Sequence, residues 1–290
     1  MIKVSVLIAA FNEELFIEEC LQSALTQSYK NIEVIVINDG STDGTGALLD
    51  AYSKKFENLR VQHQENAGKV RAFNKAFSLA TGELITFLGA DDILSVNSIL
   101  ERVTKLHATK ADIVRGRLRL LTNCNLNGVE VPRSKKNGNR SGGALLFNKK
   151  IANFAFPIPP HFPNEDVWLN LIADHLNFKN CVCKEVIYSL RIHENNSFSS
   201  VKDYNCFNIR YNERERIIYT FLDRYKDQIS KTSRRGLEGR LKIENLRFKG
   251  NFKLIFLPGN TRHKLWCVLH INKYTYKLKL FLRQFLFGII

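Results

Sequence analysis

The opening third of the chain alternates apolar runs of strand length with segments whose apolar residues recur at helical spacing. Strands that are buried on both faces and that alternate with helices form a parallel sheet of the α/β class. The sequence therefore predicts an α/β fold with a mostly parallel central sheet flanked by helices. The expected strands are 4–10, 32–39, 59–64 and 84–89, and the expected helices are 13–27, 42–56 and 68–81.

Polar residues stand where these strands end. Open α/β sheets bind their ligands at the carboxyl ends of the strands. No GxGxxG or P-loop sequence follows the first strand, which argues against a dinucleotide site and against a glycine cradle for phosphate. The polar candidates at this edge are Asn12, Glu13, Asp39, Asp91 and Asp92.

The stretch FLGADD (87–92) places Asp91 and Asp92 side by side after a buried run. Two adjacent carboxylates repel each other, and neither is stable in a core without compensation. One interpretation is a turn or a helix cap, because Asp is common in both. The other is a divalent cation held by carboxylate oxygens. The two residues alone leave both interpretations open.

The middle of the chain is less regular than its beginning. Four of the six prolines lie in PIPPHFPNED, so residues 157–166 are expected to form a fixed, irregular loop. Residues 122–142 are rich in Asn, Gly, Lys and Arg and predict an exposed loop or hairpin. The remaining expectations are strands at 111–121 and 186–193, a helix at 167–176, and a basic helical region from about 205 onward.

Positive charge is concentrated at the end of the chain. Residues 201–290 hold 20 Lys and Arg against seven Asp and Glu, whereas the first 200 hold 23 against 21. No acidic residue follows Glu244. This asymmetry indicates an anionic partner for the tail, which could be a membrane surface, a nucleic acid or an acidic chain.

Targeting and redox signals predict a cytoplasmic protein. The first residues lack the cleavage site of a signal peptide, and no run approaches the ~20 apolar residues of a spanning helix. The cysteines lack CxxC spacing, so we expect reduced and mostly buried thiols. They are Cys20, Cys124, Cys181, Cys183, Cys206 and Cys267.

Six motifs occur in one order: SVLIAAFNE, VIVINDGSTDGT, NAGKVRAFN, ITFLGADD, NEDVW and RIHENNSFS. This ordered set resembles the family 2 glycosyltransferases of the GT-A (Rossmann-like) fold over residues 2–200. The resemblance implies a nucleotide-sugar donor across the strand ends. Asp39 would hold the uracil or ribose, and Arg71 the base or diphosphate. The other implied donor contacts are Ala9, Phe11, Glu13, Asn66, Ala90, Asp91 and Asp92, with Thr42 as a neighbour.

The resemblance also implies a Mn²⁺ or Mg²⁺ site. FLGADD resembles the family's Asp-x-Asp-Asp element, in which Gly89 replaces the first Asp. Asp91 is then the expected metal ligand, and Asp92 a ligand, a supporting residue or a cap. His193 resembles a family histidine that closes over the diphosphate or completes the metal shell, with Arg191 and Ser197 as lesser candidates.

NEDVW supplies Glu165 and Asp166. Taken alone, they read as the acidic first turn of a helix, which the helix dipole favours. The resemblance instead implies that Asp166 is the base for the acceptor hydroxyl and that Glu165 supports it or contacts the acceptor. His161 and Trp168 are further acceptor candidates, although Trp168 also fits a core position.

These observations predict an inverting glycosyltransferase that moves a sugar from a UDP-sugar to a hydroxyl of a glycan or lipid-linked acceptor. The expected setting is bacterial surface polysaccharide synthesis, such as capsule, O-antigen or lipooligosaccharide. Residues 1–204 would form the catalytic domain, with 1–95 on the nucleotide side and 96–204 on the acceptor side. Residues 205–290 would form a basic helical extension.

The tail (245–290) is expected to contact an anionic membrane, on the inner face of the cytoplasmic membrane. The alternative is a catalytically weak GT-A protein that binds nucleotide-sugars or acts as a membrane-associated scaffold. A nucleic-acid partner is not expected, because nothing in residues 1–200 supports one. A sugar nucleotidyltransferase would need a Gly-rich basic loop after the first strand, and that loop is absent from the sequence.

Overall fold

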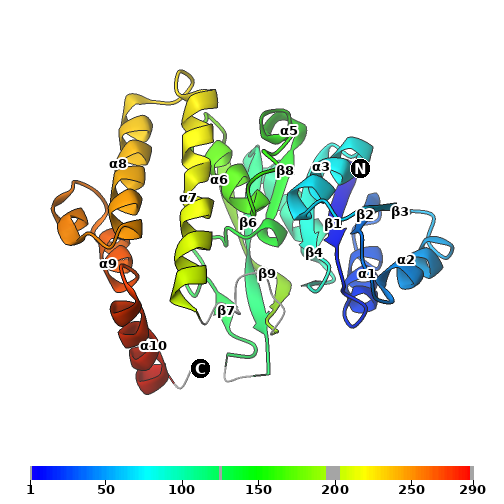
Figure 1. Cartoon of the computed structure of the whole chain (residues 1–290). Helices are drawn as coiled ribbons and strands as arrows, with labels where there is room; N and C mark the ends of the chain where they lie inside the picture. Colours follow the sequence, from blue (N-terminus) through cyan, green and yellow to red (C-terminus); the bar gives the residue numbers. More distant parts are fainter. Residues whose placement is uncertain (1, 124–125, 194–202, 288–290) are drawn as a thin grey trace. The chain divides into compact units, whose positions relative to one another are not determined.

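The computed structural model describes residues 2–123, 126–193 and 203–287 (Figure 1). Side chains are described as far as Phe281. The chain divides into two compact units. The sheet unit comprises Met1–Thr122 and Asn127–Arg191, and the helical unit comprises Asn123–Leu126 and Ile192–Ile290.

The sheet unit is built on one mixed sheet with the strand order β3-β2-β1-β4-β8-β6-β9-β5, and β7 pairs with β6. The pairs β3/β2, β2/β1, β1/β4 and β6/β9 are parallel, whereas β4/β8, β8/β6, β9/β5 and β6/β7 are antiparallel. The predicted α/β class is thus confirmed. The strands are β1 Val4–Ala10, β2 Ile32–Asp39, β3 Leu59–Gln64, β4 Leu84–Gly89, β5 Ile93–Leu94, β6 Ile113–Leu121, β7 Glu130–Val131, β8 Leu145–Asn148 and β9 Asn180–Arg191.

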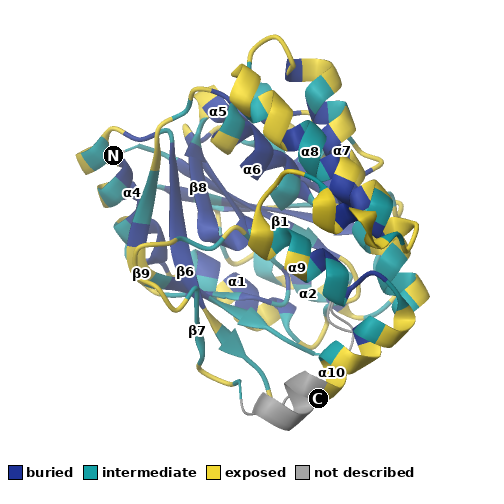
Figure 2. Ribbon diagram, turned by 90° about the vertical axis from the view of Figure 1, so that its left-hand side faces the viewer, coloured by how far each residue is buried: buried dark blue, intermediate teal, exposed yellow. Residues whose placement is uncertain are grey.

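The helices of this unit flank the sheet, and the strand residues between them are largely buried (Figure 2). Residues of β1, β2 and β4 such as Val6, Val36 and Leu88 are fully buried, which explains their near-continuous apolar sequences. The helices are α1 Ile17–Leu25, α2 Thr45–Ser53, α3 Lys69–Leu79, α4 Ser98–Thr109, α5 Lys149–Ala155 and α6 Glu165–His175, with a short η1 at Gly142–Ala144.

Strand register brings the predicted site residues to one edge. Ala10 of β1 lies opposite Asn38 of β2, and Ala9 lies opposite Gly89 of β4. Since these three strands are parallel and end at the same level, the loops that follow them start side by side. The loops carry Asn12 and Glu13, Ser41 to Gly44, and Asp91 and Asp92.

A fully buried arginine fixes α4, a helix that was not among the expected elements. Arg102 donates hydrogen bonds to Thr86 Oγ1, to Leu145 O and to Gly143 O. Burial lowers the pKa of Arg102 to about 10. The guanidinium therefore bridges α4, β4 and the start of β8 with hydrogen bonds to neutral groups.

The helical unit consists of α7 Tyr204–Tyr225, α8 Lys231–Phe248, η2 Phe252–Phe256, α9 Thr261–Leu269 and α10 Lys273–Phe287. Its core includes Ile243, Leu254, Cys267 and Ile271. Beside them Arg247, fully buried, forms a two-point ion pair with Glu244. None of the helices within the described residues is both long and apolar enough to cross a membrane.

Candidate active site

The loops after β1 and β2 are cross-bonded. Asn12 Oδ1 accepts a hydrogen bond from Thr42 N (2.8 Å), and Ser41 Oγ accepts one from Asn12 N (3.0 Å). Asn12 has a positive φ of 55°, a conformation that Asn tolerates better than most residues. The sequence NDGSTDGT therefore serves to fix the loop beside Glu13, whose N–H donates to Thr45 Oγ1.

Asp39, the predicted nucleotide ligand, is buried and organises the loop before α3. Its carboxylate accepts hydrogen bonds from Ala67 N (2.9 Å), Gly68 N (2.8 Å) and Gln64 Nε2 (2.7 Å). Hydrogen bonds to a charged group are stronger than neutral ones. Asp39 thus positions the first turn of α3, and a contact with the nucleotide stays a prediction.

Replacing Asp39 with Ala should lower the free energy of unfolding by about 3 kcal/mol, because two loop N–H groups lose a charged acceptor. Urea denaturation of the purified variant measures this loss. A change below about 1 kcal/mol would show that the loop forms without Asp39.

Asp91 and Asp92 occupy different environments. Asp92 is buried, and its Oδ1 accepts a hydrogen bond from Arg191 N (2.9 Å), while Asp91 is half-buried. Burial and the Asp91 charge raise the pKa of Asp92 well above its usual range. Arg191 Nε donates to Asp91 O (2.8 Å), so the end of β9 is tied to the turn that carries both acids.

Gly89 makes room for the two carboxylates. A Cβ at this position would lie 2.8 Å from Asp91 Oδ1 and 2.8 Å from Asp92 Oδ2, closer than real Cβ contacts. An Asp in place of Gly89, as in the usual family element, would require both side chains to move. The glycine therefore allows a compact acidic pair, with oxygen ligands of the kind that Mg²⁺ and Mn²⁺ prefer.

Glu13 adds negative charge at the same edge. Burial, the Asp91 charge and the Asp43 charge raise the pKa of Glu13 to about 7, against a lowering by Arg191. Within residues 2–123, 126–193 and 203–281, no three His, Cys, Asp or Glu side chains are grouped to hold a metal ion. Mg²⁺ sites at phosphate-transfer centres commonly use one or two carboxylates and complete the shell with substrate oxygens and water. The acidic edge fits such a cation.

The raised pKa of Glu13 predicts a pH-dependent effect on stability. Between pH 4.5 and about 7 the folded chain keeps a proton on Glu13 that the unfolded chain releases, so rising pH removes stability across this window. Glu13→Gln should remove that cost and stabilise the chain by about 1 kcal/mol at pH 8 but not at pH 4. Unfolding curves at both pH values, without divalent cations, check this; equal stability of the two proteins at pH 8 would contradict it.

Lys69 is a candidate functional residue that the sequence reasoning missed. Its ammonium lies 3.1 Å from Glu165 Oε1 and links the start of α3 to the start of α6. Burial lowers the pKa of Lys69, but the charges of Glu165 and Asp166 raise it by more, so the net shift is upward. A lysine in the first turn of a helix is unfavourable, because the positive end of the helix dipole lies there. This unfavourable position was the one sign in the sequence that Lys69 has an acidic partner.

Glu165 is buried in a space left by a glycine. It is 4% exposed, and its Oε2 has no hydrogen-bond partner among the described residues. A Cβ on Gly142 would lie 2.8 Å from Glu165 Oε1, so only glycine leaves room for the carboxylate in this position. Glu165 is thus fixed by Lys69 with one oxygen still able to accept a hydrogen bond.

The remaining predicted residues are placed as follows. Asp166 is half-buried in the first turn of α6, and His161 is exposed in the preceding loop. Trp168 is fully buried and donates to Ala155 O (2.8 Å), so its ring belongs to the core and cannot stack on a sugar.

The predicted donor contacts differ in their exposure. Phe11 is 46% exposed, and Asn66 and Arg71 are exposed, whereas Ala9 is half-buried and Ala90 is buried.

Two candidates lie outside the sheet unit. His193 belongs to the helical unit, so a shared site with Asp91 stays a prediction. Ser197 lies outside the described residues.

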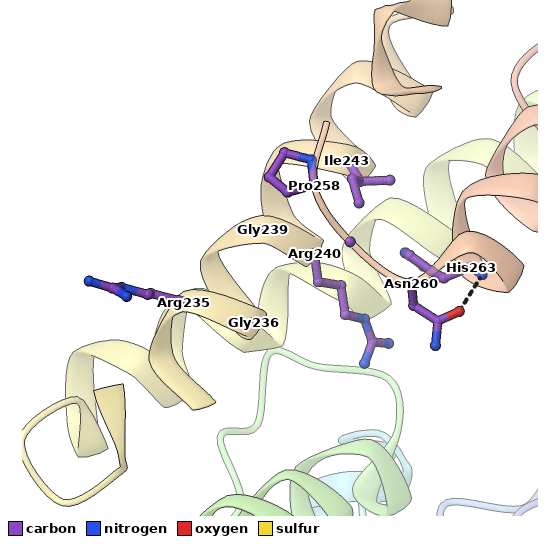
Figure 3. A pocket seen from close by; sticks show the side chains of 9 residues that line it. Arg235, Gly236, Gly239, Arg240, Ile243, Pro258, Asn260 and His263 are labelled. Carbon is purple, nitrogen blue, oxygen red and sulfur yellow. Dashed lines mark hydrogen bonds between the residues drawn. The ribbon is translucent and has the colours of Figure 1, made fainter. Parts of the chain in front are cut away.

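The helical unit contains a cavity that none of the predicted site residues lines. Its volume is 790 Å³, and it lies between α8 and residues 258–263 (Figure 3). Arg235 and Arg240 are among its lining residues, and Arg240 is engaged in a two-point ion pair with Glu215. Asn260 Oδ1 accepts a hydrogen bond from His263 N at its wall.

The chain is thus an α/β protein with a mixed sheet, and acidic side chains follow β1 and β4 and begin α6. Residues 5–159 match the family model "Glycosyl transferase family 2". The chain therefore belongs to glycosyl transferase family 2.

Curated relatives agree over part of the chain. Glycosyltransferase GlyG of Streptococcus pneumoniae serotype 4 is 39% identical over 114 residues, which is 39% of this chain and 38% of GlyG. Poly(ribitol-phosphate) beta-glucosyltransferase of Bacillus spizizenii is 34% identical over 136 residues, covering 46% of this chain and 21% of that protein. The matches thus span well under two thirds of these relatives.

Solved structures share the fold. TarS of S. aureus, crystallised with UDP-GlcNAc, matches 95% of this chain and 83% of its own at a TM-score of 0.64 and 18% identity. The mannosyltransferase PcManGT of Pyrobaculum calidifontis, in complex with GDP-Man and Mn²⁺, covers 96% and 83% at a TM-score of 0.61 and 18% identity. The fold is GT-A.

Proposed function

We propose that the chain is an inverting glycosyltransferase that moves a sugar from a UDP-sugar to a hydroxyl group. The observation that carries this proposal is the meeting of two acidic sets at the same edge of the sheet. Asp91 and Asp92 follow β4, and Glu165 and Asp166 begin α6. The Lys69 ammonium pairs with Glu165, and the charges of Glu165, Asp166 and Asp92 all raise its pKa. The complexes of TarS with UDP-GlcNAc and of PcManGT with GDP-Man and Mn²⁺ support a nucleotide-sugar donor.

Asp166 accepts the proton of the acceptor hydroxyl, whose oxygen then attacks the anomeric carbon from the face opposite the diphosphate. The Lys69 ammonium fixes Glu165 beside this base, and the oxygen of Glu165 that has no described partner is available to a second acceptor hydroxyl. A Mn²⁺ or Mg²⁺ held by Asp91, with His193 as the proposed second ligand, would neutralise charge on the diphosphate leaving group. Positioning and electrostatic stabilisation supply most of the rate acceleration.

The acceptor is proposed to be a growing bacterial surface glycan or its lipid-linked form. The name of the B. spizizenii relative, a poly(ribitol-phosphate) glucosyltransferase, supports a surface-polymer acceptor. We further propose that residues 1–204 act as the catalytic domain and that the basic segment 245–290 attaches the chain to the inner face of the cytoplasmic membrane. Its nine Lys and Arg and absence of acids support an anionic lipid partner.

A donor screen by thermal shift tests the donor proposal. With Mn²⁺ present, UDP and UDP-sugars at ~100-fold over their dissociation constant should stabilise the chain by about 2.7 kcal/mol. GDP, at the same concentration, serves as the control and should stabilise less. If no nucleoside diphosphate or nucleotide-sugar stabilises the folded chain, the chain does not bind such a donor and the proposal is wrong.

A further inference from the structure

Helix α10 has an inner and an outer face. On the inner face, Tyr276 is buried and its ring stacks 5.0 Å from that of Phe207 of α7. Lys279, one turn further on, places its Nζ 2.7 Å from Nε2 of the buried His270. His270 Nδ1 lies 2.7 Å from Trp266 O, so Nδ1 carries the proton and Nε2 accepts from Lys279. This face holds α10 on the rest of the helical unit.

The outer face is apolar and exposed. Tyr274, Leu278 and Phe281 are 71%, 52% and 61% exposed, and they are spaced four and three residues apart. Residues at this spacing lie on one side of a helix. We call these three side chains the α10 outer face. Monomeric proteins seldom expose a contiguous apolar stripe without an interaction partner.

The charges around α10 complement an anionic surface. In the sequence, Lys277 and Lys279 fall on different sides of the helix, which spoils a simple amphipathic pattern. The structure resolves this conflict, because Lys279 turns inward to His270 while Lys273 and Lys277 stay exposed. Since no acidic residue follows Glu244, the outer face is flanked by cations without acids from its own segment.

We propose that the α10 outer face docks on an anionic lipid bilayer, with Tyr274 and Leu278 entering the interface and Lys273 and Lys277 contacting the headgroups. Interfacial helices combine an apolar face with lysines that extend to the headgroups. This inference rests on the membrane attachment proposed above and assigns it to one helix face.

The experiment measures co-sedimentation of the full chain with vesicles of phosphatidylglycerol and phosphatidylcholine, and with phosphatidylcholine alone, at low and high salt. The wild-type chain should bind the anionic vesicles and dissociate at high salt. Tyr274→Ser/Leu278→Ser should weaken binding by at least about tenfold. Lys277→Gln should weaken it about fivefold, more than Lys279→Gln, because Lys279 faces inward.

A matched control is Phe256→Ser, which removes an apolar side chain that is 87% exposed in η2 of the same unit and should leave binding unchanged. Circular dichroism on the same samples shows whether each variant is folded. UDP release shows whether transfer activity is retained, so that a failure of the proposed activity is distinguished from a failure of this inference. If the double variant binds like wild type, attachment stands but the α10 inference is overturned, whatever Phe256→Ser does. If wild type ignores anionic vesicles, both membrane proposals fail. If light scattering shows that the double variant loses only self-association, the face binds a second copy instead, and the inference also fails.

Discussion

Replacing Asp166 with Asn should lower the rate of sugar transfer by ~100- to 10,000-fold while UDP affinity stays unchanged. The amide keeps the shape of the side chain but cannot accept the acceptor's proton, and general-base catalysis contributes a factor of this size. Asp166 is half-buried at the start of α6, and we propose that the donor binds at the loops after β1, β2 and β4, so the effect should fall on kcat and leave UDP binding intact.

Single-turnover transfer and calorimetric titration of UDP measure the two quantities separately. The exposed Glu57→Gln provides a charge-matched control away from the site and should behave as wild type. Transfer by Asp166→Asn within a few-fold of wild type would show that Asp166 serves as an acidic first-turn residue of α6 and not as the base.

Asp91→Ala should abolish turnover that depends on Mn²⁺ or Mg²⁺ and weaken UDP binding in the presence of metal. The substitution removes a hard oxygen ligand from a half-buried position. Asp92→Ala should instead lower thermal stability, because the buried Asp92 carboxylate accepts the hydrogen bond from Arg191 N. The two variants should therefore differ: Asp91→Ala should lose activity, and Asp92→Ala should lose stability.

Activity assays with and without chelator, combined with melting curves, distinguish the two variants. Wild-type activity of Asp91→Ala in chelator would mean that the metal assignment is wrong. An equal loss of stability in both variants would mean that the pair acts as a structural turn.

The sequence predicted the first four strands well because they are short apolar runs. The expected strands 59–64 and 84–89 coincide with β3 and β4. The helices α1 and α2 start later than expected, at Ile17 and Thr45, because the residues before them form the cross-bonded loops. Helix α4 was missed although Ile99, Val103 and Leu106 stand at helical spacing and are buried on one face. What the sequence could not show is that Arg102 is buried on that face and bonded to Thr86.

The candidate residues differ in how far the sequence alone can point to them. Asp91, Asp92 and Asp166 stand in local motifs, so sequence order is enough to propose them, and their roles stay predictions. Lys69 is a candidate only through its ion pair with Glu165, which is 96 positions away in the sequence, so it can be found only once α3 is packed in the folded unit. The sequence cannot tell whether Trp168 packs in the core or stacks on a sugar. Its complete burial in the structure shows that it packs in the core.

UDP release from a panel of UDP-sugars, measured with Mn²⁺ and again with a chelator, tests the central claim most directly. The account predicts that at least one UDP-sugar releases UDP with Mn²⁺, that the chelator stops the release, and that Asp91→Ala abolishes it with Mn²⁺ present. A folded chain that binds UDP-sugars but releases no UDP with any of them, with Mn²⁺ and a hydroxyl acceptor present, would contradict the account and identify a nucleotide-sugar-binding protein without turnover.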